Sequence, residues 1–276
     1  MQEGCAVEAL LGEADLERRE ARMLLAHASG VAEASLAAFP ERLIDAPAAA
    51  RFRAWARRRS DGEPFAYIIG MREFYGRRFT VTPAVLIPRP ETELLIERAI
   101  ECAQGLQRPR MLDLGTGSGA IAVTLACELP QAQVTATDAS CRALEIAAFN
   151  GNALAPGRIE WLESDWLVGL SGRAFELIVA NPPYITAGDP HLARGDLRFE
   201  PLAALVGGLD GMQCIDAIVA AAPEHLAAAG WLLLEHGFDQ GAPVRARLAA
   251  AGFESITTWR DLAGLERISG ARHPAV

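Results

Sequence analysis

The sequence contains no lysine, so all 26 of its basic residues are arginines. Schiff-base catalysis, a lysine general base and the phosphate-binding lysine of a P-loop all need that residue and are therefore excluded. The five cysteines are scattered, odd in number and never form a C-x-x-C pair, which argues against disulfides and zinc sites. The five histidines show no metal-type spacing, and we expect no metal ion.

Long uninterrupted apolar runs are also missing. The most apolar stretch, residues 214–234, is broken by Asp216, Pro223, Glu224 and His225. The first thirty residues carry several Glu and Arg side chains and no apolar signal region. We therefore expect a soluble, cytoplasmic protein that does not cross a membrane.

Charge is unevenly distributed along the chain. The first 80 residues carry 12 arginines and 12 acidic residues, so the whole net charge of −9 lies in the remainder. An acidic body binds duplex DNA poorly, because contacts to phosphates supply most of that affinity. We expect no stable binding of nucleic acid, and a monomer.

The length of 276 residues is about twice that of a typical domain and predicts one large domain with a smaller one. Apolar residues follow a helical period over residues 16–30, with Gly30 as a stop, and a second helix is predicted from Pro47 to Gly62. A small helical domain is therefore predicted over residues 1–70.

The second predicted helix carries a run of arginines. This run could bind nucleic acid or an acidic partner, or it could be a solvated helix face, and both interpretations are open. The residues concerned are Arg51, Arg53, Arg57, Arg58 and Arg59.

The pattern changes after residue 70. Strand-forming residues around Gly76 predict a β-hairpin linker over residues 71–87, and a helix is predicted over residues 91–100. Apolar runs then alternate with helix-length segments, which indicates a parallel α/β sheet covered on both faces, within a domain spanning residues 88–276. The predicted strands are 111–114, 134–138, 159–163, 177–180, 231–235, 256–259 and a last one near Ile268.

A glycine-rich segment closes the first of these strands and opens a helix. Alternate glycines let the backbone turn sharply and approach a ligand closely, with a helix N-terminus directed at it. The same pattern suits a nicotinamide cofactor and S-adenosyl-L-methionine, so this loop leaves both open. Its residues are Gly115, Thr116, Gly117, Ser118 and Gly119.

Acidic residues follow the next two strands. Asp138 ends the second strand, where its carboxylate can accept both ribose hydroxyls of an adenosine, or it can cap the helix predicted to start at Ala139. Asp165 and Trp166 follow the third strand, and the carboxylate can accept from an adenine amino group while the indole covers the ring. Trp166 could equally be a core residue.

Asn181, Pro182, Pro183 and Tyr184 follow the fourth strand directly. An amide nitrogen can be methylated only if both its hydrogens are held by acceptors, so that its delocalised lone pair is directed at the methyl donor. The side-chain oxygen of Asn181 and the backbone carbonyl of Pro182 are two such acceptors, and the ring of Tyr184 can pack against a planar group. This motif favours S-adenosyl-L-methionine over a nicotinamide cofactor.

With these residues in hand, the chain resembles the HemK/PrmC family of glutamine-N5 methyltransferases. The likeness spans most of the chain, although the extreme N-terminus matches only loosely. The matching segments are EPFAYIIGMREFYGRRF (63–79), LIPRPETE (86–93), DLGTGSGAIA (113–122), NPPYI (181–185), GDLRFEPLAAL (195–205) and LLLEHG (232–237).

The resemblance implies a helical N-terminal domain that docks the partner, and a hairpin that joins it to a Rossmann-like, seven-stranded methyltransferase sheet. It implies N5-methylation of the glutamine in the Gly-Gly-Gln motif of class-1 peptide-chain release factors, with S-adenosyl-L-homocysteine as the product. It also implies that residues 115–119, Asp138 and Trp166 contact the cofactor, and that residues 181–184 hold the glutamine. Arg89 and Glu91 would border the glutamine pocket; helix capping by Glu91 or Thr92 is the alternative.

Four other functions remain as rivals. Asn-Pro-Pro-Tyr also occurs in enzymes that methylate adenine N6 in nucleic acid, because that amine presents the same two hydrogens. A ribosomal-protein glutamine methyltransferase is closer kin. A nicotinamide oxidoreductase and a non-catalytic sensing module are the alternatives from other classes.

Overall fold

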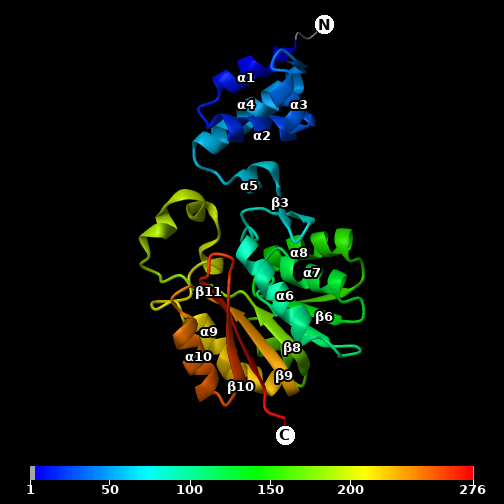
Figure 1. The fold of residues 1–276 in the computed structure, drawn as a ribbon, viewed down its shortest axis with the longest axis vertical. Helices are drawn as coiled ribbons and strands as arrows, with labels where there is room; N and C mark the ends of the chain where they lie inside the picture. The colour runs from blue at the N-terminus through cyan, green and yellow to red at the C-terminus, as the bar shows by residue number, and fades with distance from the viewer. Residues whose placement is uncertain (1–3, 276) are drawn as a thin grey trace. The chain divides into compact units, whose positions relative to one another are not determined.

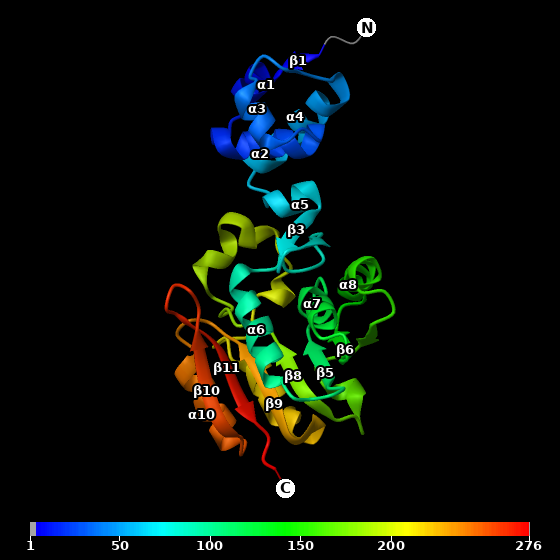
Figure 2. The ribbon, with the colours of Figure 1, turned by 45° about the vertical axis from the view of Figure 1, so that its right-hand side comes forward.

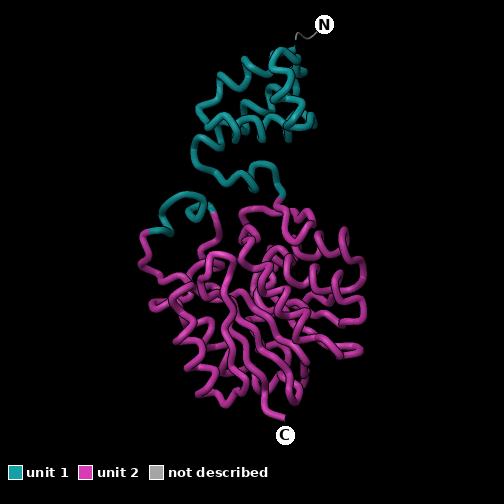
Figure 3. The backbone as a smooth tube through the Cα atoms, in the orientation of Figure 1, with its two compact units in different colours: residues 1–71, 191–199 teal, residues 72–190, 200–276 magenta. Residues whose placement is uncertain are grey.

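The computed structural model describes residues 4–275 and consists of two compact units (Figure 3). The first unit comprises the described residues up to Met71 together with His191–Phe199, and the second comprises Arg72–Pro190 and the residues from Glu200 onward. The segment 191–199 therefore shares a unit with helices far from it in sequence, which no sequence pattern indicates. The predicted hairpin linker falls almost entirely within the second unit.

The first unit is mainly helical, as the sequence predicts (Figure 1). A short antiparallel pair of strands, which the sequence pattern did not predict, joins the segment before the first helix to the segment between the third and fourth helices. Its core is apolar and includes Leu24, Leu25 and Phe52. Its elements are β1 (Cys5–Ala6), α1 (Val7–Glu13), α2 (Arg18–Ser29), α3 (Glu33–Ala38), β2 (Leu43–Ile44), α4 (Ala46–Ser60), α5 (Phe65–Ile69), and, from the distant segment, the 3-10 turn η4 (Gly195–Phe199).

For the two longest helices of this unit, the sequence predicts the C-terminal end of α2 and, to within one residue, the start of α4. Helix α2 ends at Gly30, which adopts a left-handed conformation with φ of 71° that favours glycine. Helix α4 begins at Ala46, one residue before Pro47, because the Asp45 side chain accepts a hydrogen bond from the Ala48 N–H at 2.7 Å.

The predicted hairpin is shorter than expected. Strands β3 (Met71–Phe74) and β4 (Arg77–Thr80) pair through a turn at Tyr75 and Gly76, both with positive φ. Phe74 and Phe79 are buried in the core of the second unit. Residues 81–87, predicted as part of the hairpin, form no strand and lead instead toward the cavity described below.

The second unit is built on a seven-stranded sheet of order β10-β11-β9-β8-β5-β6-β7 (Figure 2). All seven predicted strands are confirmed, most of them one or a few residues longer than predicted. They are β5 (Arg110–Leu114), β6 (Gln133–Asp138), β7 (Ile159–Glu163), β8 (Phe175–Ala180), β9 (Leu226–Glu235), β10 (Glu254–Arg260) and β11 (Glu266–Arg272).

The expectation of a wholly parallel sheet is wrong at one strand. Strands β5 to β9 pair in parallel, whereas β11 is antiparallel to both β9 and β10. The physical reason is the connection, since only residues 261–265 join β10 to β11 and a parallel crossover needs a dozen residues or more.

Helices cover both faces of this sheet. Residues of α6 and α7 pack with the hairpin in one apolar cluster, and residues of α9 and α10 pack in another on the opposite face. The helices are α6 (Glu93–Cys102), α7 (Ala120–Glu128), α8 (Cys141–Leu154), α9 (Gln213–Ala221) and α10 (Gly241–Ala250), with 3-10 turns η1 (Pro90–Thr92), η2 (Val168–Leu170), η5 (Leu202–Ala204) and η6 (Ala222–His225). The 3-10 turn η3 (Pro190–Ala193) begins in this unit and continues into the segment 191–199 of the first unit. Among residues 4–275, no helix is long and apolar enough to span a membrane.

Candidate active site

A cavity of about 420 Å³ lies at the carboxyl ends of the central parallel strands of the second unit. In an open α/β sheet this is the edge at which ligands bind. Its wall includes residues that follow β5, β6, β7 and β8, together with the loop before η1 and helix α9. The members used below are Gly115, Gly117, Asp138, Asp165, Trp166, Asn181, Pro183 and Cys214.

The glycine loop forms one wall of this cavity. Gly115 and Gly117 line it with φ of 69° and 56°, a left-handed backbone that a residue with a side chain adopts only under strain. The other three predicted contacts do not line it. Thr116 and Ser118 are buried, and a Cβ on Gly119 would meet Ala147 at 3.1 Å, so this glycine serves the packing of α7 on α8.

Asp113 holds the glycine loop from behind. One carboxylate oxygen accepts hydrogen bonds from the Thr116 hydroxyl at 2.6 Å and from the Ala122 N–H at 3.1 Å. Within the described residues its other oxygen, Oδ1, is buried without a partner. Burial raises the pKa of this carboxyl to about 7, against the effect of those two hydrogen bonds.

Asp138 ends β6 at the cavity, as predicted. Its carboxylate accepts from the Gly117 N–H and from the Ser140 N–H, each at 2.9 Å, which fixes both oxygens at the rim of the cavity. The alternative role as a helix cap is wrong, because α8 begins at Cys141 and Ser140 caps it by accepting from the Ala143 N–H.

Asp165 and Trp166 line the cavity beyond β7. Trp166 has φ of 49°, and its ring lies so close to Gly115 that a Cβ there would meet it at 3.3 Å. A hydrogen bond from the Ser164 hydroxyl to the Trp166 carbonyl, at 3.0 Å, supports this turn. Trp166 also packs partly against an apolar cluster, so it meets both the cavity and the core.

Asn181 follows β8 and lines the cavity. Its amide nitrogen Nδ2 donates to the Thr92 hydroxyl oxygen at 3.1 Å. Because the nitrogen end of the amide faces Thr92, the carbonyl oxygen Oδ1 is the end left for a ligand. Pro183 lines the cavity as well.

Pro182 and Tyr184 lie outside the cavity lining. Pro182 is buried, and Tyr184 packs partly against the core, where burial raises the pKa of its phenol. The Tyr184 carbonyl accepts from Gln240 Nε2 at 3.0 Å, which ties the loop to the start of α10. Packing of the Tyr184 ring on a planar substrate group therefore stays a prediction.

Arg89 and Glu91 also lie outside the cavity lining. Arg89 forms an ion pair with Glu200 at 2.6 Å, and Glu200 has almost no exposed surface. Glu91 is exposed. The capping alternative is wrong for Thr92, which precedes α6 but makes no side-chain cap hydrogen bond.

No sequence pattern gave a role in the site to three residues of this region. Cys214 of α9 lines the cavity. Thr92 is buried beside Asn181, and Glu235, at the end of β9, is only 1% exposed. A signal for Glu235 did exist, since one carboxylate ends the otherwise apolar run Leu232 to Leu234.

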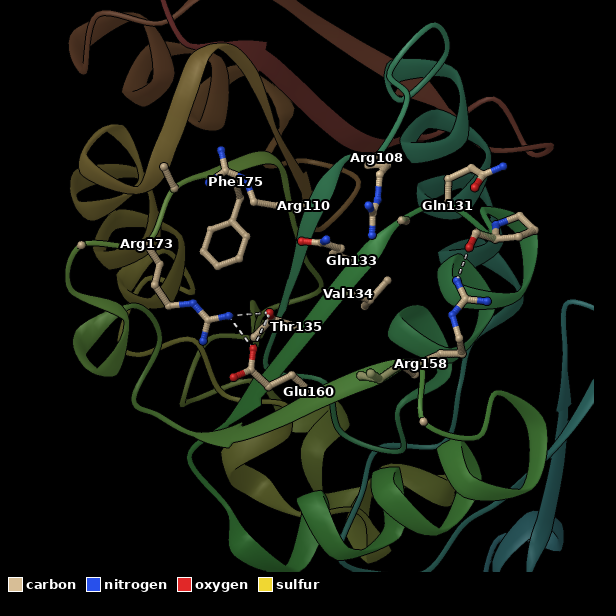
Figure 4. A pocket seen from close by; sticks show the side chains of 16 residues that line it. Arg108, Arg110, Gln131, Gln133, Val134, Thr135, Arg158, Glu160, Arg173 and Phe175 are labelled. Carbon is tan, nitrogen blue, oxygen red and sulfur yellow. Dashed lines mark hydrogen bonds and ion pairs between the residues drawn. The ribbon is translucent and has the colours of Figure 1, made fainter.

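A larger cavity, of about 660 Å³, lies at the opposite, amino-terminal ends of β5 to β8 (Figure 4). It is lined by several arginines, of which Arg173 pairs with Glu160 and Arg110 with Glu176. It has neither the glycine loop nor Asn181, and ligands of α/β sheets bind at the other edge. The smaller cavity is therefore the candidate active site.

The arginine run of α4 is largely engaged within the first unit. Arg53 pairs with Glu13, Arg58 with Glu63, Arg59 with Glu20 and Asp196, and Arg51 donates to the Ala28 carbonyl. These contacts favour a structural role for most of the run. Within this run, only the side chain of Arg57 has no hydrogen-bond or ion-pair partner among the residues described.

Comparison with known proteins identifies the family. Residues 6–70 match the PrmC N-terminal domain and residues 90–194 match the methyltransferase small domain. The chain is 49% identical to the release factor glutamine methyltransferase of Burkholderia pseudomallei, over 96% of this chain and 95% of that protein. It is 48% identical to that of Bordetella pertussis, over 95% and 97%. The chain belongs to the family of release factor glutamine methyltransferases.

The enzyme class predicted from sequence is therefore confirmed. A nicotinamide oxidoreductase and a non-catalytic sensing module are wrong, since the family consists of methyltransferases. The family also extends to Escherichia coli, whose protein is 44% identical over 93% of this chain and 92% of its own length.

Solved structures with low sequence identity share the fold. A methyltransferase from Pyrococcus furiosus matches with a TM-score of 0.55 and 18% identity, covering 80% of this chain and 98% of that one. The hMettl16 catalytic domain, solved in complex with MAT2A 3′UTR hairpin 1, matches with a TM-score of 0.56 and 14% identity, covering 85% and 86%. These likenesses confirm the predicted Rossmann-like methyltransferase sheet.

Proposed function

We propose that this protein uses S-adenosylmethionine to methylate the side-chain nitrogen N5 of the glutamine in the Gly-Gly-Gln motif of class-1 peptide-chain release factors. The observation that carries the proposal is the orientation of Asn181, whose amide nitrogen is bound to Thr92 while its carbonyl oxygen is left for a ligand at the cavity. The names of the relatives support the same substrate.

The cavity suits an adenosine with a charged amino-acid tail. The carboxylate of Asp138 can accept from ribose hydroxyls, the ring of Trp166 can cover a heterocycle, and Asp165 can accept from an exocyclic amine. The backbone at Gly115 and Gly117 allows close approach. When bound, S-adenosylmethionine would supply an electrophilic methyl group. Transfer to the amide nitrogen would break the S–CH₃ bond, form a C–N bond and leave S-adenosylhomocysteine, and the nitrogen would release one proton to water.

The substrate carboxamide needs two acceptors for its two N–H groups. Asn181 Oδ1 and the carbonyl oxygen of Pro182 would supply them, and proline stiffens the loop because its φ is fixed. The methyl donor is already activated, so no strong base is required. Positioning and polarisation of the nitrogen would carry the rate.

Incubation with radiolabelled S-adenosylmethionine and a purified release factor tests this function. Wild-type release factor should become labelled, and a variant with the motif glutamine changed to alanine should not. Label that persists in the glutamine variant would defeat the proposed target. A ribosomal protein and an adenine-containing oligonucleotide, offered in parallel, should remain unlabelled.

Asn181→Ala tests the catalytic loop in the same assay. By analogy with loss of a transition-state hydrogen-bond partner, we expect kcat to fall by a factor of about 10²–10³. Binding of S-adenosylhomocysteine, measured by calorimetry, should stay close to that of wild type. A loss of cofactor affinity with unchanged kcat would assign Asn181 to the cofactor site alone.

A further inference from the structure

Asn181 is held from behind by a buried chain of polar groups within the second unit. The first link is the 3.1 Å hydrogen bond from Asn181 Nδ2 to the Thr92 hydroxyl oxygen. The Thr92 hydroxyl in turn lies next to the carboxylate of Glu235, at the end of β9, and stabilises its charged form, which lowers the pKa of that carboxyl. Thr92 and Glu235 are 4% and 1% exposed, so water does not compete for these bonds.

We propose that Glu235 is a positioning residue that acts through Thr92 to decide which end of the Asn181 amide faces the cavity. The inference rests on the proposed function, because it explains how Asn181 presents an acceptor to the substrate amide. Neither Glu235 nor Thr92 lines the cavity.

The direction of the hydrogen bonds carries the argument. An ionised carboxylate can only accept, so the single hydroxyl hydrogen of Thr92 is directed to Glu235. Only lone pairs of the Thr92 oxygen then remain for Asn181, and these can bind the amide NH₂ but not the amide carbonyl. The Asn181 carbonyl is thereby turned away from Thr92. If the direction of these hydrogen bonds were reversed, the NH₂ of Asn181 would face the NH₂ of the substrate, and two donors cannot form a hydrogen bond.

The same carboxylate also holds the other end of the Asn-Pro-Pro-Tyr loop. The Tyr184 hydroxyl also stabilises the charged form of the Glu235 carboxylate and so lowers its pKa. Glu235 thus ties together η1, the loop after β8 and strand β9. Its oxygen Oε2 is buried without a hydrogen-bond partner in the described part of the chain.

The ionisation of Glu235 therefore bears on the rate. Burial raises its pKa to about 7; Thr92, Tyr184 and Arg267 of β11 act in the opposite direction, and Glu91 of η1 adds to the rise. Once protonated, the carboxyl can donate to Thr92, which permits the reversed direction of hydrogen bonding and a flipped Asn181 amide. The maximal rate should therefore fall as the pH drops below about 7, and Glu235→Gln should remove this acid limb.

Glu235→Gln is the central test, because a carboxamide of nearly equal size can donate to Thr92. We expect kcat for the release factor to fall about tenfold or more, which is a smaller loss than the factor of about 10²–10³ for direct removal of a transition-state partner, with KM for S-adenosylmethionine unchanged. Thr92→Val should cause a similar loss, whereas Thr92→Ser should restore most of the rate. The double variant Thr92→Val/Glu235→Gln should lose little more than either single variant, because both break one chain.

Each outcome decides something. A folded Glu235→Gln enzyme within twofold of wild-type kcat overturns the proposal, and so does additive loss in the double variant. If Glu235→Gln does not fold, the contrast between Thr92→Val and Thr92→Ser decides instead. A wild-type enzyme that fails to label the release factor refutes the proposed function separately.

A readout without substrate distinguishes these two failures. The side-chain NH₂ signals of Asn181 can be assigned in a ¹⁵N correlation spectrum by their loss in Asn181→Ala. We expect the hydrogen-bonded signal of wild type to persist in Thr92→Ser and to shift in Thr92→Val and Glu235→Gln. An unchanged signal in the last two variants would overturn the proposal, whatever the substrate.

Discussion

At the scale of single residues, the candidate site depends on backbone conformations and orientations that only particular side chains permit. Gly115 has φ of 69° and lies against the ring of Trp166, which itself has φ of 49°. A non-glycine residue with positive φ costs on the order of 1–3 kcal/mol and persists where the surroundings enforce it. The strain at Trp166 therefore accompanies a defined ring position over the glycine loop.

Gly115→Ala should weaken cofactor binding. The new Cβ would lie 3.3 Å from the Trp166 ring, so the ring must move. In addition, the backbone would bear the cost of a positive φ at a residue with a side chain. We expect the Kd for S-adenosylhomocysteine, measured by calorimetry, to rise about tenfold or more, equivalent to about 1.4 kcal/mol. Gly76→Ala is the matched control, with the same φ of 69° and nothing within 4 Å of its Cβ. Equal loss of affinity in both variants would show that the ring is not involved.

Asp113 should make the fold less stable as the pH rises. Its folded pKa of about 7 lies above the unfolded value of 3.8, so the folded state holds the proton more tightly. The contribution of the Asp113 proton to the free energy of unfolding is most favourable below pH 4, declines between pH 4 and 7, and is fully lost above pH 7. Urea unfolding at pH 5.5 and pH 8 should therefore show a smaller decline for Asp113→Asn than for wild type. An identical pH dependence in the two proteins would contradict a raised pKa.

At the scale of elements, the shared direction of the parallel strands determines where most residues of the candidate site lie. Five parallel strands end at one edge of the sheet, and a polar or glycine residue ends or follows each. These residues are Gly115 after β5, Asp138 ending β6, Asp165 after β7, Asn181 after β8 and Glu235 ending β9. Strand direction therefore determines where the cavity can form, and the strand-to-helix turns determine what lines it.

Helix α4 illustrates how local chemistry fixes an element. Asp45 accepts from the Ala48 N–H, so Asp45→Ala should lower the free energy of unfolding of the first unit by about 1 kcal/mol. Asp45→Asn keeps an accepting oxygen and should lose much less. Urea unfolding followed by circular dichroism measures both. Equal stability of the alanine variant and wild type would show that the cap contributes nothing.

At the scale of the whole molecule, the absence of lysine gives the surface its character. Every cation is an arginine, and many of these form ion pairs, including most of the run on α4. Exposed ion pairs each contribute at most about 1 kcal/mol. Their clearer effect is on binding, because an arginine that already has a carboxylate partner offers less charge to another protein.

Charge reversal on α4 tests whether the run contacts the release factor. Arg57→Glu changes the one arginine of the run without a described partner, and we expect kcat/KM for full-length release factor to stay unchanged. Arg59→Glu would face Glu20 and Asp196 and should lower the thermal midpoint. A fall in kcat/KM for Arg57→Glu, seen with the full-length factor but not with a short Gly-Gly-Gln peptide, would instead make the run a docking surface.

The sequence by itself determined the periodic elements, the order of strands along the chain and the loop motifs. Glycines at 115 and 117 and the segment 181–184 could be recognised because a turn and a strand end are local properties of the backbone. The same local patterns also predicted the helical domain and identified the family. These local patterns could not predict contacts between residues that are distant in sequence.

Only the tertiary structure decided which side chains share the site. Thr92, Asn181 and Glu235 lie on three separate segments, and they meet because the sheet and η1 pack together. The grouping of residues 191–199 with the N-terminal helices arises in the same way. Periodicity encodes which face of an element is buried, but the partner it meets there depends on how all the elements pack at once.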